Sequence, residues 1–550
     1  MERRSICAEG AWVNRPWAAA MLAALTAVLC SCLPGTGAHE SRQQAQRDAV
    51  TLPRNLHDLG PLGSFYKSAA IIAENKRPGT NAWRIPHPGP HYGIEGFADR
   101  TSAHEGQHVR LFVSTGARRF IVRAFRMGYY GGKGARLVWQ SRSLRGSLQR
   151  GVSVSSSTNT VQALWRPSLR IKITRAWVPG DYLLKLSGTD GSQRYVPLTV
   201  TDPASRAAVV MMNGVTTWQA YNDWGGYSLY RGADGTYESR ARAVSFDRPY
   251  SSGAGAAGFL INELPVVQLA ERLGLDVTYI TSVDLHSRPH LLTRHRALVS
   301  LGHDEYWSTK MRRAALIGRS RGTNIALLGA NADYRHIRFS ASRWGRHRIE
   351  ICYKSAIEDP QYGRNNDAVT VEWRYPPLNK PESVLNGAIY ECSNVSAHGR
   401  FVSTPRWLFH GSGIHPGTWM RNLVYGEYDR VQPGFPTPST IQILAHSPLS
   451  CGPRATYADI TYYSAPGGAG VFDASTSSWI PYIGSDCALG LGCDNRGRAL
   501  ATVTSNLLKE FAKGPAGAAH PSVPNTAHFG IRLSRPLWPA LSRQGSRDRG

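Results

Sequence analysis

The chain has 550 residues, of which 42% are hydrophobic, and this length allows several domains with a large core. The formal net charge is +26, which first suggests nucleic acid as a partner. The basic residues are scattered, however, and no dense run of Lys and Arg occurs, so we do not expect nucleic-acid binding. The charge fits a weak general attraction to anionic envelope polymers or lipids.

The N-terminal segment has the features of an export signal, because Arg3, Arg4 and Arg15 precede a short apolar run at residues 18–29. We expect residues 1–33 to be a signal peptide or lipoprotein signal. The protein would then be periplasmic, a cell-envelope lipoprotein or secreted.

Residues 29–32 (LCSC) resemble a bacterial lipobox, which would make Cys32 the lipidated residue. An uncleaved anchor and ordinary cleavage near Ala38 are the alternatives. Either a lipid or an N-terminal anchor would attach the chain to a membrane. The sequence that follows, residues 34–91, is polar and irregular, and we expect it to be a tether and linker.

Residues 92–203 alternate between apolar and polar positions in short runs that Gly and Pro separate. This pattern predicts a β-sandwich domain. The predicted strands are residues 109–113, 120–126, 169–173, 181–186 and 194–200.

Residues 204–515 have a different pattern. Continuous apolar runs alternate with segments in which the apolar residues have helical spacing. This pattern predicts an α/β domain with a parallel, doubly wound sheet. The expected strands are residues 207–212, 277–280, 298–301 and 324–329, with helices at residues 265–273 and 309–319. From about residue 345 to 500 the pattern returns to β-like segments with long loops, which we interpret as β-rich insertions. The fold class is therefore α/β plus all-β, followed by a disordered tail at residues 516–550.

Five cysteines follow residue 32, and outside the cytosol they are disulfide candidates. Cys487 and Cys493 are close in a Gly-rich loop, so we predict that they pair. Cys352 with Cys392 is a second expected pair. Five is an odd number, so one cysteine is left over.

Polar residues follow three of the predicted α/β strands at their carboxyl ends. Tyr221 lies in the first cluster, His303 and Glu305 in the second, and Asn331 in the third. Each residue also has an ordinary structural explanation, such as packing, an Arg partner or a turn. Together they predict one site, because these strand ends meet at one crevice of the sheet.

Familiar catalytic motifs are missing from the sequence. We find no His-Glu-x-x-His, no Gly-x-Ser-x-Gly and no P-loop. A carboxylate pair for sugar hydrolysis is an alternative, with Glu305 and either Glu263 or Glu427 as the pair.

The ordered set of motifs resembles the large-subunit family of N,N-dimethylformamidase over roughly residues 92–510. The motifs are residues 125–132 (FRMGYYGG), 180–183 (GDYL), 218–222 (WQAYN), 302–307 (GHDEYW), 329–331 (GAN), 426–429 (GEYD) and 471–472 (VF). The resemblance implies a β-sandwich followed by a domain like that of glutamine amidotransferases. It also implies a mononuclear Fe(III) site bound by two tyrosines and one glutamate.

The resemblance suggests Tyr221 and Glu305 as metal ligands, and Tyr182 as the second tyrosine. His303, Asn331 and Glu427 match positions that the resemblance makes catalytic. Phe472 matches a substrate-binding position. Phenolate and carboxylate oxygens suit Fe(III), and a metal with open positions would activate water toward an amide.

The sequence thus predicts an exported, iron-dependent amidohydrolase that acts on a small or substituted amide. A second copy of the chain or a small subunit would be its protein partner. Two alternatives remain open: a non-catalytic protein that binds envelope polysaccharide, and a glycosidase that uses Glu305.

Overall fold

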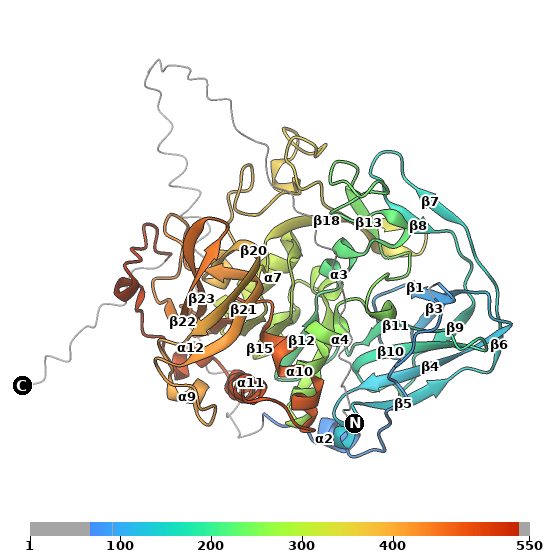
Figure 1. Cartoon of the computed structure of the whole chain (residues 1–550), viewed down its shortest axis with the longest axis horizontal. Helices are drawn as coiled ribbons and strands as arrows, with labels where there is room; N and C mark the ends of the chain where they lie inside the picture. The colour runs from blue at the N-terminus through green and yellow to red at the C-terminus, as the bar shows by residue number, and fades with distance from the viewer. Residues whose placement is uncertain (1–65, 91, 538–550) are drawn as a thin grey trace, which may run out of the picture. The chain divides into compact units, whose positions relative to one another are not determined.

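A computed structural model describes residues 66–90 and 92–537 of the chain (Figure 1). The largest sheet has seven strands in the order β14-β12-β15-β17-β24-β23-β22. The first five of these are parallel. They are β12 (Val209–Asn213), β14 (Val277–Thr281), β15 (Ala297–Leu301), β17 (Asn324–Leu328) and β24 (Gly470–Asp473).

The parallel strands are apolar along their length because both faces of the sheet are covered. In β12, Val209 and Met211 belong to one apolar cluster, and Val210 and Met212 belong to another. The first cluster includes α5 (Leu264–Arg272) and α11 (Asn495–Lys513). The second includes α7 (Thr309–Ser320).

Apart from their end residues, the predicted strands and helices of this part of the chain are therefore confirmed, as is the mixed α/β class.

Three further sheets come from the first part of the described chain, drawn in blue to cyan in Figure 1. The smallest pairs β7 (Val152–Val154) with β8 (Val161–Ala163), and the other two are larger. One has the order β1-β3-β9 and the other β2-β11-β10-β4-β5, with β6 paired to β4. Apolar residues of both sheets share one cluster, which includes Leu111 of β3, Val122 of β4 and Leu184 of β10. The strands are β1 (Ile94–Ala98), β2 (Ser102–Ala103), β3 (His108–Thr115), β4 (Arg119–Met127), β5 (Ala135–Gln140), β6 (Leu144–Arg145), β9 (Leu169–Lys172), β10 (Gly180–Gly188) and β11 (Gln193–Val200).

The region predicted to hold β-rich insertions supplies long antiparallel strands and also helices. β20 (Ile389–Arg400) pairs with β21 (Trp419–Arg430), and β22 (Gln442–Cys451) pairs with β23 (Arg454–Ser464). A separate sheet has the order β13-β19-β18-β16. Its strands are β13 (Ala243–Ser245), β16 (Tyr306–Ser308), β18 (Arg335–Ser342) and β19 (Gly345–Ile351). The helix α10 (Trp479–Leu489) lies in a stretch for which the sequence predicted β-like structure and loops, and α11 begins at the end of that stretch and continues beyond it.

The ends of the described chain differ from the predicted tether and disordered tail. Residues 516–537 contain α12 (Ala516–Ala519) and a 3-10 helix at Thr526–Phe529. Ile531 packs in an apolar cluster of the parallel sheet. The Asn525 side chain accepts a hydrogen bond from the Ile443 N–H at 2.8 Å and donates one to the Ile443 carbonyl at 2.9 Å. These contacts order a segment whose composition alone predicted disorder.

The export signal at residues 1–33 and most of the predicted tether lie outside the described residues. Near its start the described chain forms α2 (Ala69–Asn75). Among the helices that the structure describes, none is long and apolar enough to cross a lipid bilayer.

A fully buried ion pair joins the first sheets to the parallel sheet. Arg126 of β4 contacts Glu271 of α5 through two bonds of 2.6 and 2.9 Å, and both side chains are 0% exposed. Asn75 and Tyr279 also donate to Glu271, at 2.5 and 2.6 Å. The carboxylate is thus surrounded by donors, as a buried charge requires.

We expect Arg126→Met to lower the free energy of unfolding by about 3–5 kcal/mol, because it leaves the Glu271 carboxylate buried without its cation. The double variant Arg126→Met/Glu271→Leu should recover much of this loss, since neither charge is then buried. Urea denaturation of the wild type and both variants measures the effect. Equal stability of the wild type and the single variant would contradict this prediction.

Candidate functional site

The candidate site is built at the carboxyl ends of β12, β15 and β17, which are neighbours in the parallel sheet. β12 leads into α3 (Val215–Tyr221), whose last residue is Tyr221. β15 is followed by a turn at Gly302 and then by His303 and Glu305. Asn331 follows β17. The structure therefore brings together the residues that the three strand-end motifs singled out, as expected for this type of sheet.

Three oxygen atoms from Tyr221, Tyr230 and Glu305 converge at the centre of the site. Each of the two tyrosine hydroxyls lies 2.8 Å from the same Glu305 Oε2 atom, and the hydroxyls are 2.8 Å from each other. The two rings stack with centroids 4.4 Å apart. Glu305 is only 2% exposed, whereas the Tyr221 residue is 43% exposed. The cluster thus has a buried carboxylate and one tyrosine that faces solvent.

Cations and a third tyrosine surround this cluster. Arg335 donates through Nε to the other Glu305 oxygen at 2.9 Å. Tyr306 donates to the Tyr230 hydroxyl at 2.7 Å. The buried Lys354 ammonium lies 3.1 Å from the centroid of the Tyr230 ring. Arg335 therefore pairs directly with the buried Glu305 carboxylate, and Lys354 lies against the neighbouring Tyr230 ring.

His303 links Glu305 to a second carboxylate. Its Nε2 atom is 3.0 Å from Glu427 Oε2 and 3.6 Å from Glu305 Oε2. The Asn331 side-chain amide donates to the same Glu427 oxygen at 3.3 Å. Glu427 is carried by β21, outside the parallel strands, so the β20–β21 pair supplies one side of the site.

Two residues of the site have a left-handed backbone. Asn331 has φ 59° and Lys354 has φ 59°. Asn331 is held in place by its backbone N–H, which donates to both Asp429 oxygens at 2.9 and 3.1 Å. A Lys in this conformation is unusual, and such strain is found most often at functional sites.

The surroundings of each group shift its acidity. Burial raises the pKa of the Tyr221 and Tyr230 hydroxyls well above the ordinary value, and the Glu305 charge raises it further. Burial alone would raise the pKa of Glu305, but Arg335 and His303 outweigh it and lower the pKa.

The two basic side chains shift in opposite directions. Burial lowers the pKa of His303, but Glu427 more than compensates and raises that pKa to about 9. Burial, followed by repulsion from Arg335, lowers the pKa of Lys354 to about 7. The site therefore favours an ionised Glu305 beside neutral phenols and a protonated His303.

The donor set consists of oxygen atoms, which suit a hard metal ion. Within the described residues, no group of three or more His, Cys, Asp and Glu side chains could hold a metal. Tyrosine is not one of these four residue types. The Tyr221, Tyr230 and Glu305 oxygens are close enough to one another to share one ion. Two phenolates and one carboxylate fit Fe(III) by their hardness and negative charge.

The family model described as N,N-dimethylformamidase beta subunit-like, C-terminal, matches residues 121–489. The matched region runs from β4 to α10 and contains every residue of the cluster. This chain belongs to that family. A comparison with curated proteins gave no match.

In this member of the dimethylformamidase-like family, Tyr182 and Phe472 lie away from the cluster. Tyr182 is buried in the apolar cluster of the first sheets, where its ring packs on Trp177 and its hydroxyl donates to the Val178 carbonyl at 2.8 Å. Phe472 is fully buried in β24 with its ring against Trp479. Both side chains therefore pack in apolar surroundings, and neither has a contact with the cluster in the described structure.

Four residues of the site were missed by the sequence prediction. Tyr306 is part of the recognised motif at residues 302–307, and Arg335 closely follows the one at residues 329–331, so both could have been included. Lys354 and Tyr230 lie in stretches without a recognised motif. Tyr230, and not Tyr182, has its hydroxyl beside Glu305.

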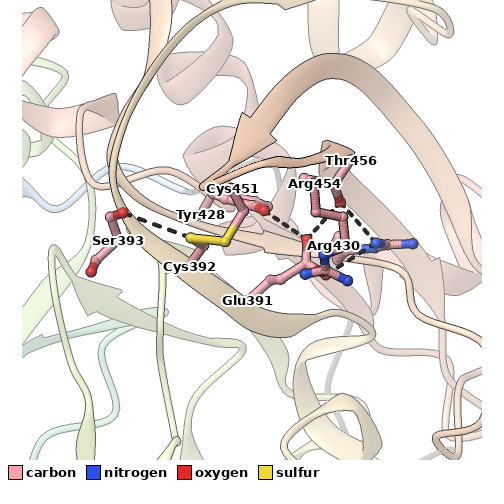
Figure 2. Close-up of a disulfide and its surroundings, with 8 residues drawn as sticks. All are labelled: Glu391, Cys392, Ser393, Tyr428, Arg430, Cys451, Arg454 and Thr456. Carbon is pink, nitrogen blue, oxygen red and sulfur yellow. Dashed lines mark hydrogen bonds and ion pairs between the residues drawn. A yellow bond between two sulfur atoms is a disulfide. The ribbon is translucent and has the colours of Figure 1, made fainter. Parts of the chain in front are cut away.

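A disulfide fastens the strand pair that carries Glu427. Cys392 of β20 is joined to Cys451 at the end of β22 (Figure 2). Beside it, the Glu391 carboxylate accepts hydrogen bonds from four side chains, Tyr428 at 2.6 Å, Arg430 at 3.1 Å, Arg454 at 2.8 Å and Thr456 at 2.6 Å. Tyr428 directly follows Glu427, so this network fixes the strand next to the site.

The cysteine predictions have mixed outcomes. The predicted Cys487–Cys493 disulfide is confirmed. The expected Cys352–Cys392 pair is wrong, because Cys392 is joined to Cys451 and Cys352 is a free, buried thiol. Sequence spacing alone could not show that β20 and the end of β22 lie side by side.

We expect Cys392→Ser/Cys451→Ser to lower the free energy of unfolding by about 4 kcal/mol, because that disulfide closes a loop of 59 residues. Cys487→Ser/Cys493→Ser is the matched control. It should cost about 2 kcal/mol, because its loop spans 6 residues. Chemical denaturation under oxidising conditions measures both, and a larger loss in the control variant would refute the expectation.

Proposed function

We propose that this chain hydrolyses the C–N bond of a small or substituted amide and releases a carboxylic acid and an amine. The observation that carries the proposal is the convergence of the Tyr221, Tyr230 and Glu305 oxygens within 2.8 Å of one another, with His303 beside them. Membership of the dimethylformamidase-like family supports the same reaction class.

Tyr221, Tyr230 and Glu305 would hold a mononuclear Fe(III) ion. When bound, the ion would supply Lewis acidity toward the amide carbonyl and water. Tyr230 replaces Tyr182 in the ligand set, because only Tyr230 has its hydroxyl at Glu305. The two tyrosines would have to lose their phenol protons to hold the ion, because the ligating form of tyrosine is the phenolate and their raised pKa values otherwise favour the phenol.

The remaining residues orient the substrate and move a proton. His303, placed between Glu427 and Glu305, would donate its Nε2 proton to the departing amine nitrogen. Glu427 holds His303 in this position, and Asn331 in turn fixes Glu427. Arg335 keeps the Glu305 carboxylate turned toward the two tyrosines. The reaction then needs no Ser or Cys nucleophile.

We further propose that the protein is exported. The two disulfides support this location, because such bonds persist in oxidising compartments. The basic and apolar N-terminal residues and the lipobox-like Cys32 agree with an exported lipoprotein, although they lie outside the described residues. The first sheets and the parallel sheet would be the β-sandwich and the amidotransferase-like domain of this proposal.

The glycosidase alternative has less support in the geometry. Glu263, one of the two expected partners of Glu305, accepts hydrogen bonds from Gly214 N–H and the Trp218 indole instead. Glu427 does lie beside Glu305, but two phenol hydroxyls occupy the Glu305 oxygen that faces it. A protein that only binds envelope polysaccharide would not need the converging oxygens.

We predict about one iron per chain and a visible phenolate-to-iron absorption band in the purified protein. Tyr221→Phe, Tyr230→Phe and Glu305→Ala should each lose most of the iron and the band, because each removes one oxygen donor. Tyr182→Phe is the matched control and should keep both. Metal analysis with absorption spectroscopy measures the outcome, and protein that stays colourless and metal-free after incubation with iron would refute the metal site.

His303→Gln should lower amide hydrolysis by about 10²–10⁴-fold and leave the iron content unchanged, because it removes a proton donor and no metal ligand. Release of amine from a panel of N-substituted small amides measures this effect. If the wild type carries iron but hydrolyses none of these amides, the hydrolase proposal fails. Full activity in His303→Gln would show only that another group donates the proton.

A further inference from the structure

Two cavities flank α11 on a surface that the proposed reaction does not use. One has a volume of about 630 Å³ and lies beside the start of β21 and the first turn of α11. The other has a volume of about 530 Å³ and lies along α5 and the middle of α11. They share Arg498 and Thr502 as lining residues, so they form one continuous surface, called here the α11 groove.

The α11 groove is strongly basic. No carboxylate side chain lines either cavity, whereas five cations do: Arg272, Arg421, Arg496, Arg498 and Lys509. Arg496 pairs with Asp494 at 3.5 Å. The other four cations form no ion pair with any described residue. The groove therefore presents positive charge that the described chain does not neutralise.

An aromatic side chain and several hydroxyl and amide groups complete the lining. Trp419 is 55% exposed at the start of β21, and the Arg400 guanidinium lies 5.7 Å from its ring. The exposed indole offers a flat apolar surface at the edge of the groove. The polar lining residues are Ser412, Thr418, Asn495, Thr502, Ser505 and Asn506.

We propose that the α11 groove binds an acidic polysaccharide. Guanidinium groups pair well with carboxylate groups of uronic acid residues, and the Trp419 ring offers a flat surface for a sugar ring. Side chains that both donate and accept hydrogen bonds match the many hydroxyl groups of a sugar chain. Nucleic acid would use the same cations and polar groups, but the exported location proposed above puts the chain among acidic envelope polymers, so polysaccharide is the better match.

The groove and the candidate site are connected by a single strand. Arg421 lies near the start of β21 and Glu427 lies six residues further on, which corresponds to about 20 Å of extended chain. Tyr425, between them, is 57% exposed. A polymer in the groove would therefore lie close to the site, but its binding does not depend on the proposed hydrolysis.

The test is binding of the purified protein to immobilised alginate, a polymer of uronic acids, at about 150 mM salt, where long-range charge effects are screened. We expect Arg421→Ala/Arg498→Ala to weaken binding about tenfold, because two guanidinium–carboxylate contacts are lost. Trp419→Ala should weaken it about fivefold through loss of the ring contact.

The matched control is Arg145→Ala/Arg150→Ala, which removes the same charge from exposed positions of the first sheets and should bind as the wild type does. The proposal is overturned if the wild type does not bind alginate, or if control and groove variants weaken equally. It is also overturned if neutral dextran binds equally well, or if single-stranded DNA binds more tightly through the same residues.

Discussion

The burial of Glu305 organises the site. A carboxylate that is 2% exposed must be compensated by cations and hydrogen-bond donors, and the chain supplies them from several elements. Arg335 approaches from β18, Tyr221 from α3 and Tyr230 from the loop that follows α3. The backbone takes part as well, because the Glu305 N–H donates to Thr217 of α3 and the Glu305 carbonyl accepts from the Arg335 N–H. The same contacts that make the buried charge tolerable place three oxygen donors together.

Much of the fold could be predicted from the sequence because its signals are local. The runs at residues 207–212 and 298–301 are apolar throughout since both faces of the sheet are covered, and this pattern gave their place and type. The rule that ligands bind at carboxyl strand ends then located Tyr221, His303, Glu305 and Asn331. The helices between residues 479 and 513 were not predicted. Long loops and a Gly-rich sequence obscure the helical spacing of their apolar residues.

The rest of the site could not be predicted because it depends on contacts between distant segments. Tyr182 stands in a motif that matches the family, yet the strand that carries it turns its ring into the core of the first sheets. Tyr230 has no motif, and only the folded loop brings its hydroxyl to Glu305. Glu427 was predicted from its family motif, but its distance from His303 depends on how β20, β21 and β22 are held together by Cys392, Cys451 and the Glu391 network.

The Arg126–Glu271 pair also bears on how this chain could be divided. A boundary near residue 203 separates two patterns in the sequence, and it would be the natural place to cut the gene. A fragment that begins at β12 would keep Glu271 in the core of the parallel sheet and lose the cation that neutralises it. A fragment that ends before β12 would keep the Arg126 guanidinium without its acid. The two halves are therefore not interchangeable modules, and new domain combinations should carry the first sheets and the parallel sheet together.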